Sequence, residues 1–135
     1  MSKLLKYNPK EGVVEISLPS SKSISNRLMI AQALADGKFE ISNLSKAQDT
    51  VVLTDALNSN SHLLDIGMAG TAFRFLTAFL SLQEGVRTLT GDNRMQERPI
   101  AVLVDQLRML GANIQYLEKE GYPPLKITGN TKLKG

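Results

Sequence analysis

Strand-like and helix-like hydrophobic patterns alternate along this chain, and the alternation strongly limits the folds open to it. Short runs of alternating or β-branched apolar residues are followed by longer segments with apolar residues at helical spacing, and glycines or prolines separate many of them. Such alternation is typical of α/β domains, in which helices pack on a sheet. The sequence therefore predicts an α/β fold without linkers or low-complexity segments.

The individual elements follow from these patterns and from their boundary residues. Strands are predicted at Val13–Leu18, Phe39–Leu44, His62–Ile66, Val86–Thr90, Asn113–Leu117 and Leu125–Thr128. Helices are predicted at Lys22–Ala35, Asp49–Leu57, Gly70–Leu82 and Pro99–Leu110. Asp49 is expected to cap the second helix, and the last two strands are expected to form a hairpin.

The segment Pro19–Arg27, which reads Pro-Ser-Ser-Lys-Ser-Ile-Ser-Asn-Arg, places hydroxyl groups and two cations where a strand gives way to a helix. Helix N-termini attract anions through their unpaired N–H groups and partial positive charge. Lys22 and Arg27 add full charges, and Ser23 shares a helical face with Arg27. These residues fit an anion site, and about equally well an ordinary serine-capped helix with solvated cations.

The opposite face of this first helix is apolar. Its apolar residues recur at helical spacing and are Ile24, Leu28, Ala31 and Ala35. An apolar stripe of this kind is expected to pack against a core and to leave the polar face free.

A second candidate anion site is the glycine turn before the helix at Gly70. Gly67 and Gly70 would let backbone N–H groups approach a ligand, although a simple tight turn fits them as well. Arg74 and Thr71 follow in the same helix, and Arg74 stands among apolar residues, where a cation should be paired or face a cleft.

A third cation, Arg98, directly precedes Pro99 at the expected start of another helix. An arginine fork binds carboxylate or phosphate through two hydrogen bonds, and proline limits the directions in which the fork can point. Three helix N-termini with cations are thus candidate sites for anionic ligands.

The composition narrows the function classes. The formal net charge is +3, the cations are spread along the chain, and three Tyr and four Phe offer little for base stacking, which argues against nucleic acid. Without cysteine there is no disulfide or thiolate zinc site, and the single histidine, His62, cannot specify a metal site. The charged N-terminus does not resemble a signal peptide and no apolar run approaches a membrane span, so we expect a cytoplasmic protein without membrane contact.

Three motifs in the same order resemble the 5-enolpyruvylshikimate-3-phosphate (EPSP) synthase family. They are Ser-Lys-Ser-Ile-Ser-Asn-Arg at 21–27, Gly-Met-Ala-Gly-Thr-Ala-Phe-Arg at 67–74, and Gly-Asp-Asn-Arg-Met-Gln-Glu-Arg-Pro-Ile at 91–100. The likeness continues through 107–112 and 121–125. It departs at Met68, where the family usually has Asn, and at Phe75, where it often has Pro.

The resemblance implies a fold and a domain organisation. Family members are much longer than this chain and close two similar domains over their substrates, so the chain is expected to be an N-terminal fragment. It would contain part of one domain of the inside-out α/β barrel, which is built from βαβαββ units. Residues 1–19 would belong to the other domain, and residues 20–135 would form a partial substrate-binding domain of about two units.

The resemblance also implies the reaction, which is enolpyruvyl transfer from phosphoenolpyruvate to shikimate 3-phosphate in aromatic amino acid biosynthesis. Lys22, Ser23 and Arg27 match shikimate 3-phosphate contacts, and Lys22, Gly70 and Arg98 match phosphoenolpyruvate contacts, with Thr71 and Arg74 in support. No metal or organic cofactor is implied, and the full-length enzyme is expected to be a monomer. The general acid–base carboxylates belong to the other domain, so no catalytic residue is expected here and the fragment alone should be inactive.

Three further points follow from the motifs. Because residue 70 is glycine, without a methyl group in the turn, the intact enzyme is expected to be a glyphosate target. The sister UDP-N-acetylglucosamine enolpyruvyl transferase shares the fold but typically carries a cysteine before its arginine-proline pair, which is absent here. A non-catalytic anion-binding module remains an alternative of a different class.

Overall fold

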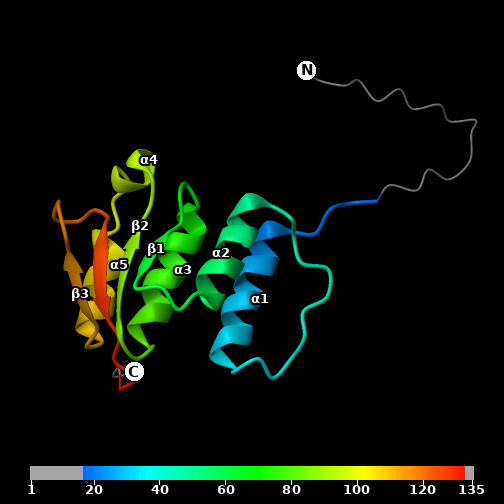
Figure 1. Ribbon diagram of the computed structural model, residues 1–135, viewed down its shortest axis with the longest axis horizontal. Coiled ribbons are helices and arrows are strands. Elements are labelled where there is room, and N and C mark those ends of the chain that lie inside the picture. The colour runs from blue at the N-terminus through cyan, green and yellow to red at the C-terminus, as the bar shows by residue number, and fades with distance from the viewer. Residues whose placement is uncertain (1–16, 133–135) are drawn as a thin grey trace, which may run out of the picture.

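The computed structural model describes residues 17–132 as a mixed α/β arrangement (Figure 1). The helices are α1 (Lys22–Leu34), α2 (Gln48–Asn58), α3 (Gly70–Ser81), α4 (Asn93–Gln96) and α5 (Ala101–Met109). The strands are β1 (Leu63–Asp65), β2 (Val86–Thr90), β3 (Asn113–Tyr116) and β4 (Leu125–Thr128). The predicted mixed α/β class is therefore confirmed. Most of the strand predicted at Val13–Leu18 lies outside the described residues.

The four strands form one sheet in the order β1-β2-β4-β3. β1 and β2 are parallel and are connected through α3, whereas β4 runs antiparallel to both β2 and β3. The expected hairpin is thus present, with Ile114 opposite Ile127. From β1 to β4 the described chain follows a βαβαββ order with the short α4 added, while residues 17–62 contain α1 and α2 but no strand.

One face of the sheet carries the core. Leu89, Leu125 and Ile127 point to this face and are essentially inaccessible to solvent, while Lys126 on the other face is exposed. α3 and α5 cover the apolar face with side chains such as Phe73 and Val104. α1 and α2 pack on α3, and Figure 1 shows them on the side of α3 away from the sheet. The N-termini of α1, α2 and α3 are thereby brought near one another.

The strand predicted at Phe39–Leu44 is wrong. These residues form an irregular segment in which Asn43 has a φ of 57°, a conformation that no strand contains. Figure 1 shows the segment running along the outer side of α1, away from the sheet, so no described strand lies beside it to complete a ladder. Ile41 and Leu44 still pack against the core, which explains the apolar alternation without a strand.

The predicted packing face of α1 is also wrong. Ile24 is 60% exposed and Leu28 is 40% exposed, whereas α1 buries Ser25, Asn26 and Met29 against its neighbours. Burial of these polar side chains is possible because both form hydrogen bonds with the segment that includes α2. The hydrophobic pattern alone could not indicate a polar helix contact.

The helices between β2 and β3 also differ from the prediction. The helix expected from Pro99 begins at Ala101, because Ile100 has non-helical backbone angles, with a φ of −130° and a ψ of 1°, and its N–H donates to the carbonyl of Gly121 at 2.9 Å. The sequence also did not predict α4, where the side chain of Asp92 accepts a hydrogen bond from the N–H of Met95 at 2.9 Å and so caps the helix.

Candidate functional site

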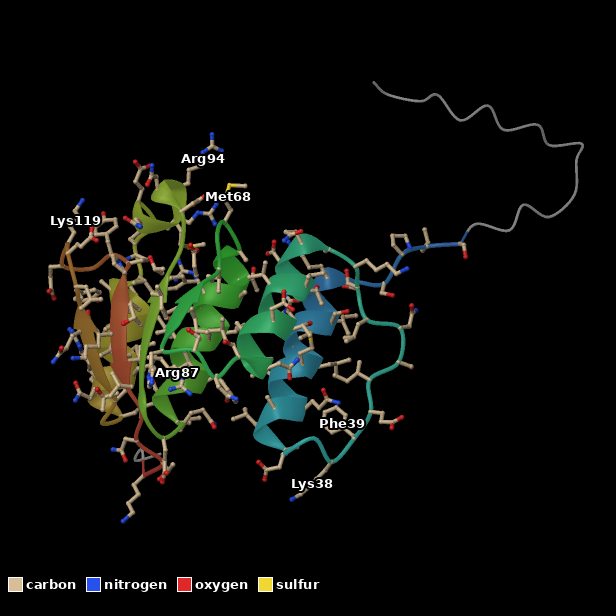
Figure 2. All side chains as sticks on the ribbon, in the orientation of Figure 1. Lys38, Phe39, Met68, Arg87, Arg94 and Lys119 are labelled. Carbon is tan, nitrogen blue, oxygen red and sulfur yellow. The ribbon has the colours of Figure 1, made fainter. Side chains whose placement is uncertain are left out.

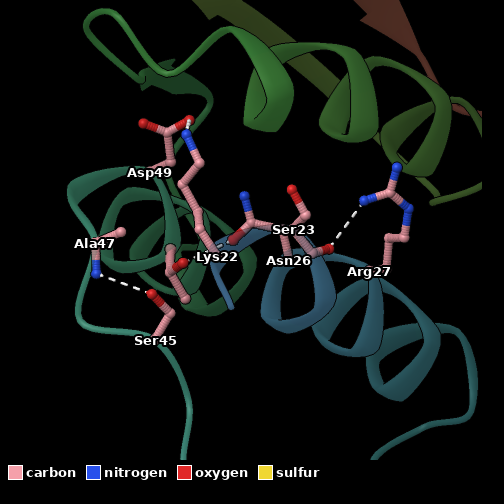
Figure 3. Close-up of polar contacts among 8 residues, drawn as sticks. Lys22, Ser23, Asn26, Arg27, Ser45, Ala47 and Asp49 are labelled. Carbon is pink, nitrogen blue, oxygen red and sulfur yellow. Dashed lines mark hydrogen bonds and ion pairs between the residues drawn. The ribbon is translucent and has the colours of Figure 1, made fainter. Parts of the chain in front are cut away.

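The N-terminus of α1 is built as the sequence predicts, with a serine cap and a nearby cation. The hydroxyl of Ser21 accepts a hydrogen bond from the N–H of Ile24 at 3.4 Å. Lys22 extends toward α2, where its Nζ lies 3.3 Å from Oδ2 of Asp49 (Figure 3). The prediction that Asp49 caps α2 is wrong, because the helix begins after Ala47 without a side-chain cap and Asp49 pairs with Lys22 instead.

A buried and a partly buried hydrogen bond hold α1 to the chain that follows it. Oγ1 of Thr50 donates to Oδ1 of Asn26 at 2.8 Å, and Oγ of Ser25 accepts from the N–H of Ser45 at 2.9 Å. Nδ2 of Asn26 is buried and has no hydrogen-bond partner within residues 17–132. We call Ser25, Asn26 and Thr50 the polar seam, which holds α1 beside α2 together with the buried apolar side chain of Met29.

A cavity of about 410 Å³ opens where the N-termini of α1, α2 and α3 approach the loop that follows α4. Its lining residues are Lys22, Asp49, Met68, Gly70, Thr71, Phe73, Arg74, Met95, Arg98, Pro99, Ile100 and Pro123. Three cations from three different segments thus surround one cavity, with one carboxylate on its border. Such a balance favours an anionic ligand.

Arg98 lies close against Gly70 in this cavity. A Cβ placed on Gly70 would collide with Nη1 of Arg98, and it would lie 3.6 Å from the Cζ atom of the same guanidinium. The absence of a side chain at Gly70 therefore lets the arginine fork lie directly against the start of α3. Gly70 is thus needed for the approach of Arg98.

Arg74 connects α3 to the same loop. Its Nη2 donates a hydrogen bond to the carbonyl oxygen of Pro99 at 3.1 Å, and its side chain is exposed at the cavity. The sequence predicts that a cation in this apolar helix is paired or faces a cleft. Both parts of that prediction are confirmed by the hydrogen bond and by the lining of the cavity.

The structure does not bring all of the predicted residues into this cavity. Ser23 and Arg27 do not line it, and Figure 3 shows Arg27 on the other side of Ser23 and Asn26 from Lys22. Nη1 of Arg27 donates to the carbonyl of Ser23 at 3.0 Å. The predicted binding residues therefore fall into a cavity group and a second group farther along α1.

Residues that the sequence reasoning missed also lie at the cavity. Asp49 pairs with Lys22, and Met95 is buried beneath the loop, where its Cε would lie 4.0 Å from a Cβ on Gly70. Figure 2 shows Met68 projecting from the loop before α3, and 60% of its surface is exposed. The sequence shows that Asp49 is an acidic residue in the first turn of α2, but it does not show that Lys22 of α1 is its partner.

His62 has a structural position. Nδ1 of His62 lies 3.1 Å from the carbonyl of Val86, next to the β1–β2 pairing.

Within residues 17–132 no group of three or more His, Cys, Asp or Glu side chains could hold a metal ion. Over the same residues, no helix is both long enough and apolar enough to cross a membrane.

Comparison with known proteins places this geometry in a family. The family model described as EPSP synthase (3-phosphoshikimate 1-carboxyvinyltransferase) matches residues 7–59 and 54–135. A 3-phosphoshikimate 1-carboxyvinyltransferase of Bacteroides fragilis is 52% identical over 121 residues, which cover 90% of this chain and 30% of the relative. The enzyme of the same name from Bordetella pertussis is 44% identical over 140 residues, covering 87% and 32%.

A solved structure gives the same result for the fold. The EPSP synthase from Acinetobacter baumannii superposes with a TM-score of 0.75 at 25% identity, and the match covers 89% of this chain and 33% of that structure. The chain thus spans about a third of the length of the relatives that it matches. Because the family model covers nearly the whole chain, the protein belongs to the EPSP synthase family.

Proposed function

We propose that this chain supplies the N-terminal part of an enzyme that transfers the enolpyruvyl group of phosphoenolpyruvate to the 5-hydroxyl of shikimate 3-phosphate. The cavity with Lys22, Arg74 and Arg98 around Gly70 is the observation that carries the proposal. Both substrates are anions, and the three cations around one cavity complement their negative charge. The 3-phosphoshikimate 1-carboxyvinyltransferase relatives support the same reaction.

In this proposal the two groups of residues bind different substrates. Lys22, Gly70 and Arg98 bind phosphoenolpyruvate in the cavity, with Thr71 and Arg74 beside them. Ser23 and Arg27, together with Lys22, bind shikimate 3-phosphate. Lys22 stands at the start of α1 and lines the cavity, so it is suited to contact both ligands.

The reaction requires charge to move on the substrates. The 5-hydroxyl of shikimate 3-phosphate loses its proton and adds to C2 of phosphoenolpyruvate while C3 gains a proton, and the tetrahedral intermediate then loses phosphate and a C3 proton. Cations stabilise the phosphate and carboxylate as this charge develops. The proton transfers are assigned to carboxylates of a second domain, so we expect the chain alone to bind without turnover.

The proposal extends to the architecture of the whole protein. Residues 20–135 would form a partial substrate-binding domain of about two βαβαββ units within an inside-out α/β barrel. Residues 1–19 would cross to the other domain, and the intact enzyme would be a cytoplasmic monomer. The βαβαββ order from β1 to β4 supports the unit.

A titration of the chain with phosphoenolpyruvate, followed by NMR, tests the proposal. We expect saturable chemical-shift changes at Gly70 and Thr71. The affinity for phosphoenolpyruvate should fall at least tenfold in Arg98→Ala, because a hydrogen bond to a charged group contributes about 1.5–3 kcal/mol. Arg94→Ala is the matched control, since Arg94 is an exposed arginine of the neighbouring α4 and does not line the cavity.

Equal affinity of the wild type and Arg98→Ala would contradict the cavity assignment. A parallel titration with UDP-N-acetylglucosamine separates the two enolpyruvyl transferase reactions, because we expect shikimate 3-phosphate to bind and the nucleotide sugar not to bind.

If the full-length enzyme is inhibited by glyphosate, the expectation based on Gly70 is also met; insensitivity would reject it.

A further inference from the structure

Arg27 has an aromatic partner that the proposed reaction does not account for. Its guanidinium carbon lies over the ring of Phe75, 5.7 Å from the ring centroid. Phe75 is half-buried on α3, whereas Arg27 is an exposed residue of α1. The contact therefore joins the second binding group to the helix whose first turn borders the cavity.

The geometry matches a cation–π interaction. A guanidinium within about 6 Å of a ring centroid is attracted to the negative face of the ring. Within the described residues, no carboxylate lies within ion-pair distance of Arg27. The ring of Phe75 and the carbonyl of Ser23, 3.0 Å from Nη1, are therefore the contacts that define the position of this side chain.

These two contacts leave most of the guanidinium free. A guanidinium carries five N–H donors, and the hydrogen bond to Ser23 uses one of them. The ring attracts the charge without using any N–H. Arg27 is thus held in place and still has donors to offer a phosphate group.

We infer that Phe75 is a positioning residue, which holds the guanidinium of Arg27 so that the cation is already placed when the phosphate of the substrate binds. The inference rests on the proposed function for the identity of the ligand. Phe75 lies one helical turn after Thr71, which lines the cavity. The same helix, α3, therefore holds residues of the cavity group and also fixes the position of Arg27 in the second group. An arginine already placed loses less conformational freedom on binding than a mobile one.

The first test does not depend on a ligand. Protons above an aromatic ring experience a ring-current shift, so the guanidinium N–H protons of Arg27, around the Cζ that lies over Phe75, should resonate upfield in the NMR spectrum of the chain. Phe75→Leu should remove the shift, and Phe75→Tyr, which keeps the ring, should retain it. An unshifted Arg27 in the wild type, or an unchanged shift in Phe75→Leu, would overturn the inference.

The second test measures affinity for shikimate 3-phosphate, with inorganic phosphate as a simpler probe. We expect Phe75→Leu to weaken binding about two- to fivefold, as the loss of an exposed cation–π contact predicts, and Phe75→Tyr to restore it. In an Arg27→Ala background, Phe75→Leu should have no further effect. An equal loss in that background would assign Phe75 a purely structural role.

The two tests separate the inference from the proposed function. If the wild-type chain bound neither probe, the proposed function of the chain would fail, and with it the role of Phe75 in binding, while the ring-current shift would still decide whether Phe75 holds Arg27. Thermal unfolding of each variant identifies any loss of affinity that results from unfolding.

Discussion

Adding one methyl group at Gly70 should weaken phosphoenolpyruvate binding while leaving the fold intact. The new Cβ would overlap Nη1 of Arg98, but its distance of 3.6 Å to Cζ is ordinary van der Waals contact. Only the end of a flexible side chain has to move, by about 1 Å to restore normal contact. Gly70 does not have a positive φ, so alanine fits its backbone and favours the start of α3.

The size of the effect follows from the guanidinium. A shift of about 1 Å is enough to break one hydrogen bond of a two-bond contact with carboxylate or phosphate, and such a bond contributes about 1.5–3 kcal/mol. Gly70→Ala should therefore raise the dissociation constant for phosphoenolpyruvate about 10- to 100-fold. Its free energy of unfolding should change by less than about 0.5 kcal/mol.

Isothermal titration calorimetry measures the affinity, and chemical denaturation measures the stability. The Arg98→Ala variant supplies the control, because Gly70→Ala should cost almost no further affinity once the guanidinium is absent. An unchanged affinity of Gly70→Ala, or a loss of the same size in the Arg98→Ala background, would refute the reasoning from Arg98.

Three other predictions concern the folded state. Thr50→Val leaves the buried Oδ1 of Asn26 without its donor and should lower the free energy of unfolding by about 1–3 kcal/mol in urea denaturation. Thr50→Ser keeps the hydroxyl and should lose less stability. Equal losses in the two variants would contradict the role of the Thr50 hydroxyl as the donor to Asn26. Gly129→Ala places a Cβ against the backbone carbonyl of Gln83 and should destabilise by at least about 1–3 kcal/mol; wild-type stability would show that this approach is not tight. Burial raises the pKa of Tyr116 above its ordinary value of 10.0. The contribution of the neutral Tyr116 to stability is therefore complete below pH 10 and is lost as the pH rises through the folded-state pKa. Denaturation between pH 9 and 12 should show this decline in stability, and Tyr116→Phe should remove the part of the decline that Tyr116 causes.

The sequence predicts the region from β1 to β4 well because local and tertiary signals agree there. The strand at Val86–Thr90 is present with the same bounds, and the helix at Gly70 differs from prediction by one residue at its end. Gly85 and Gly91 flank the strand and Gly70 begins the helix, and the apolar patterns match the faces that pack together. In this part of the chain the periodicity alone is enough to place the core.

Residues 17–58 were predicted less well because their contacts are polar or depend on neighbours. The pattern of Phe39–Leu44 suits a strand, but a strand also needs a partner, and the sequence of the segment does not contain that information. The stripe with Ile24 and Leu28 is apolar, yet Asn26 is the residue that α1 buries completely. Helical periodicity finds an apolar face and cannot decide whether that face is covered.

The cavity was predictable as a set of cations and not as a geometry. Lys22, Gly70 and Arg98 come from separate motifs, and the structure brings them together at one cavity as expected. Arg27 was expected at the same site on the basis of helical spacing. It lies elsewhere because residues on one face of a helix still differ in height, and Arg27 is more than one turn beyond Lys22.

The polar seam has a consequence for the precision of the cavity. A shift of α1 by one residue would move its atoms about 1.5 Å along the axis and break the bond between Asn26 and Thr50. Buried polar groups without partners make such a slip unfavourable. The height of Lys22 beside α2 is therefore determined by two side chains that do not line the cavity, so variation at these positions would change the site without touching a ligand.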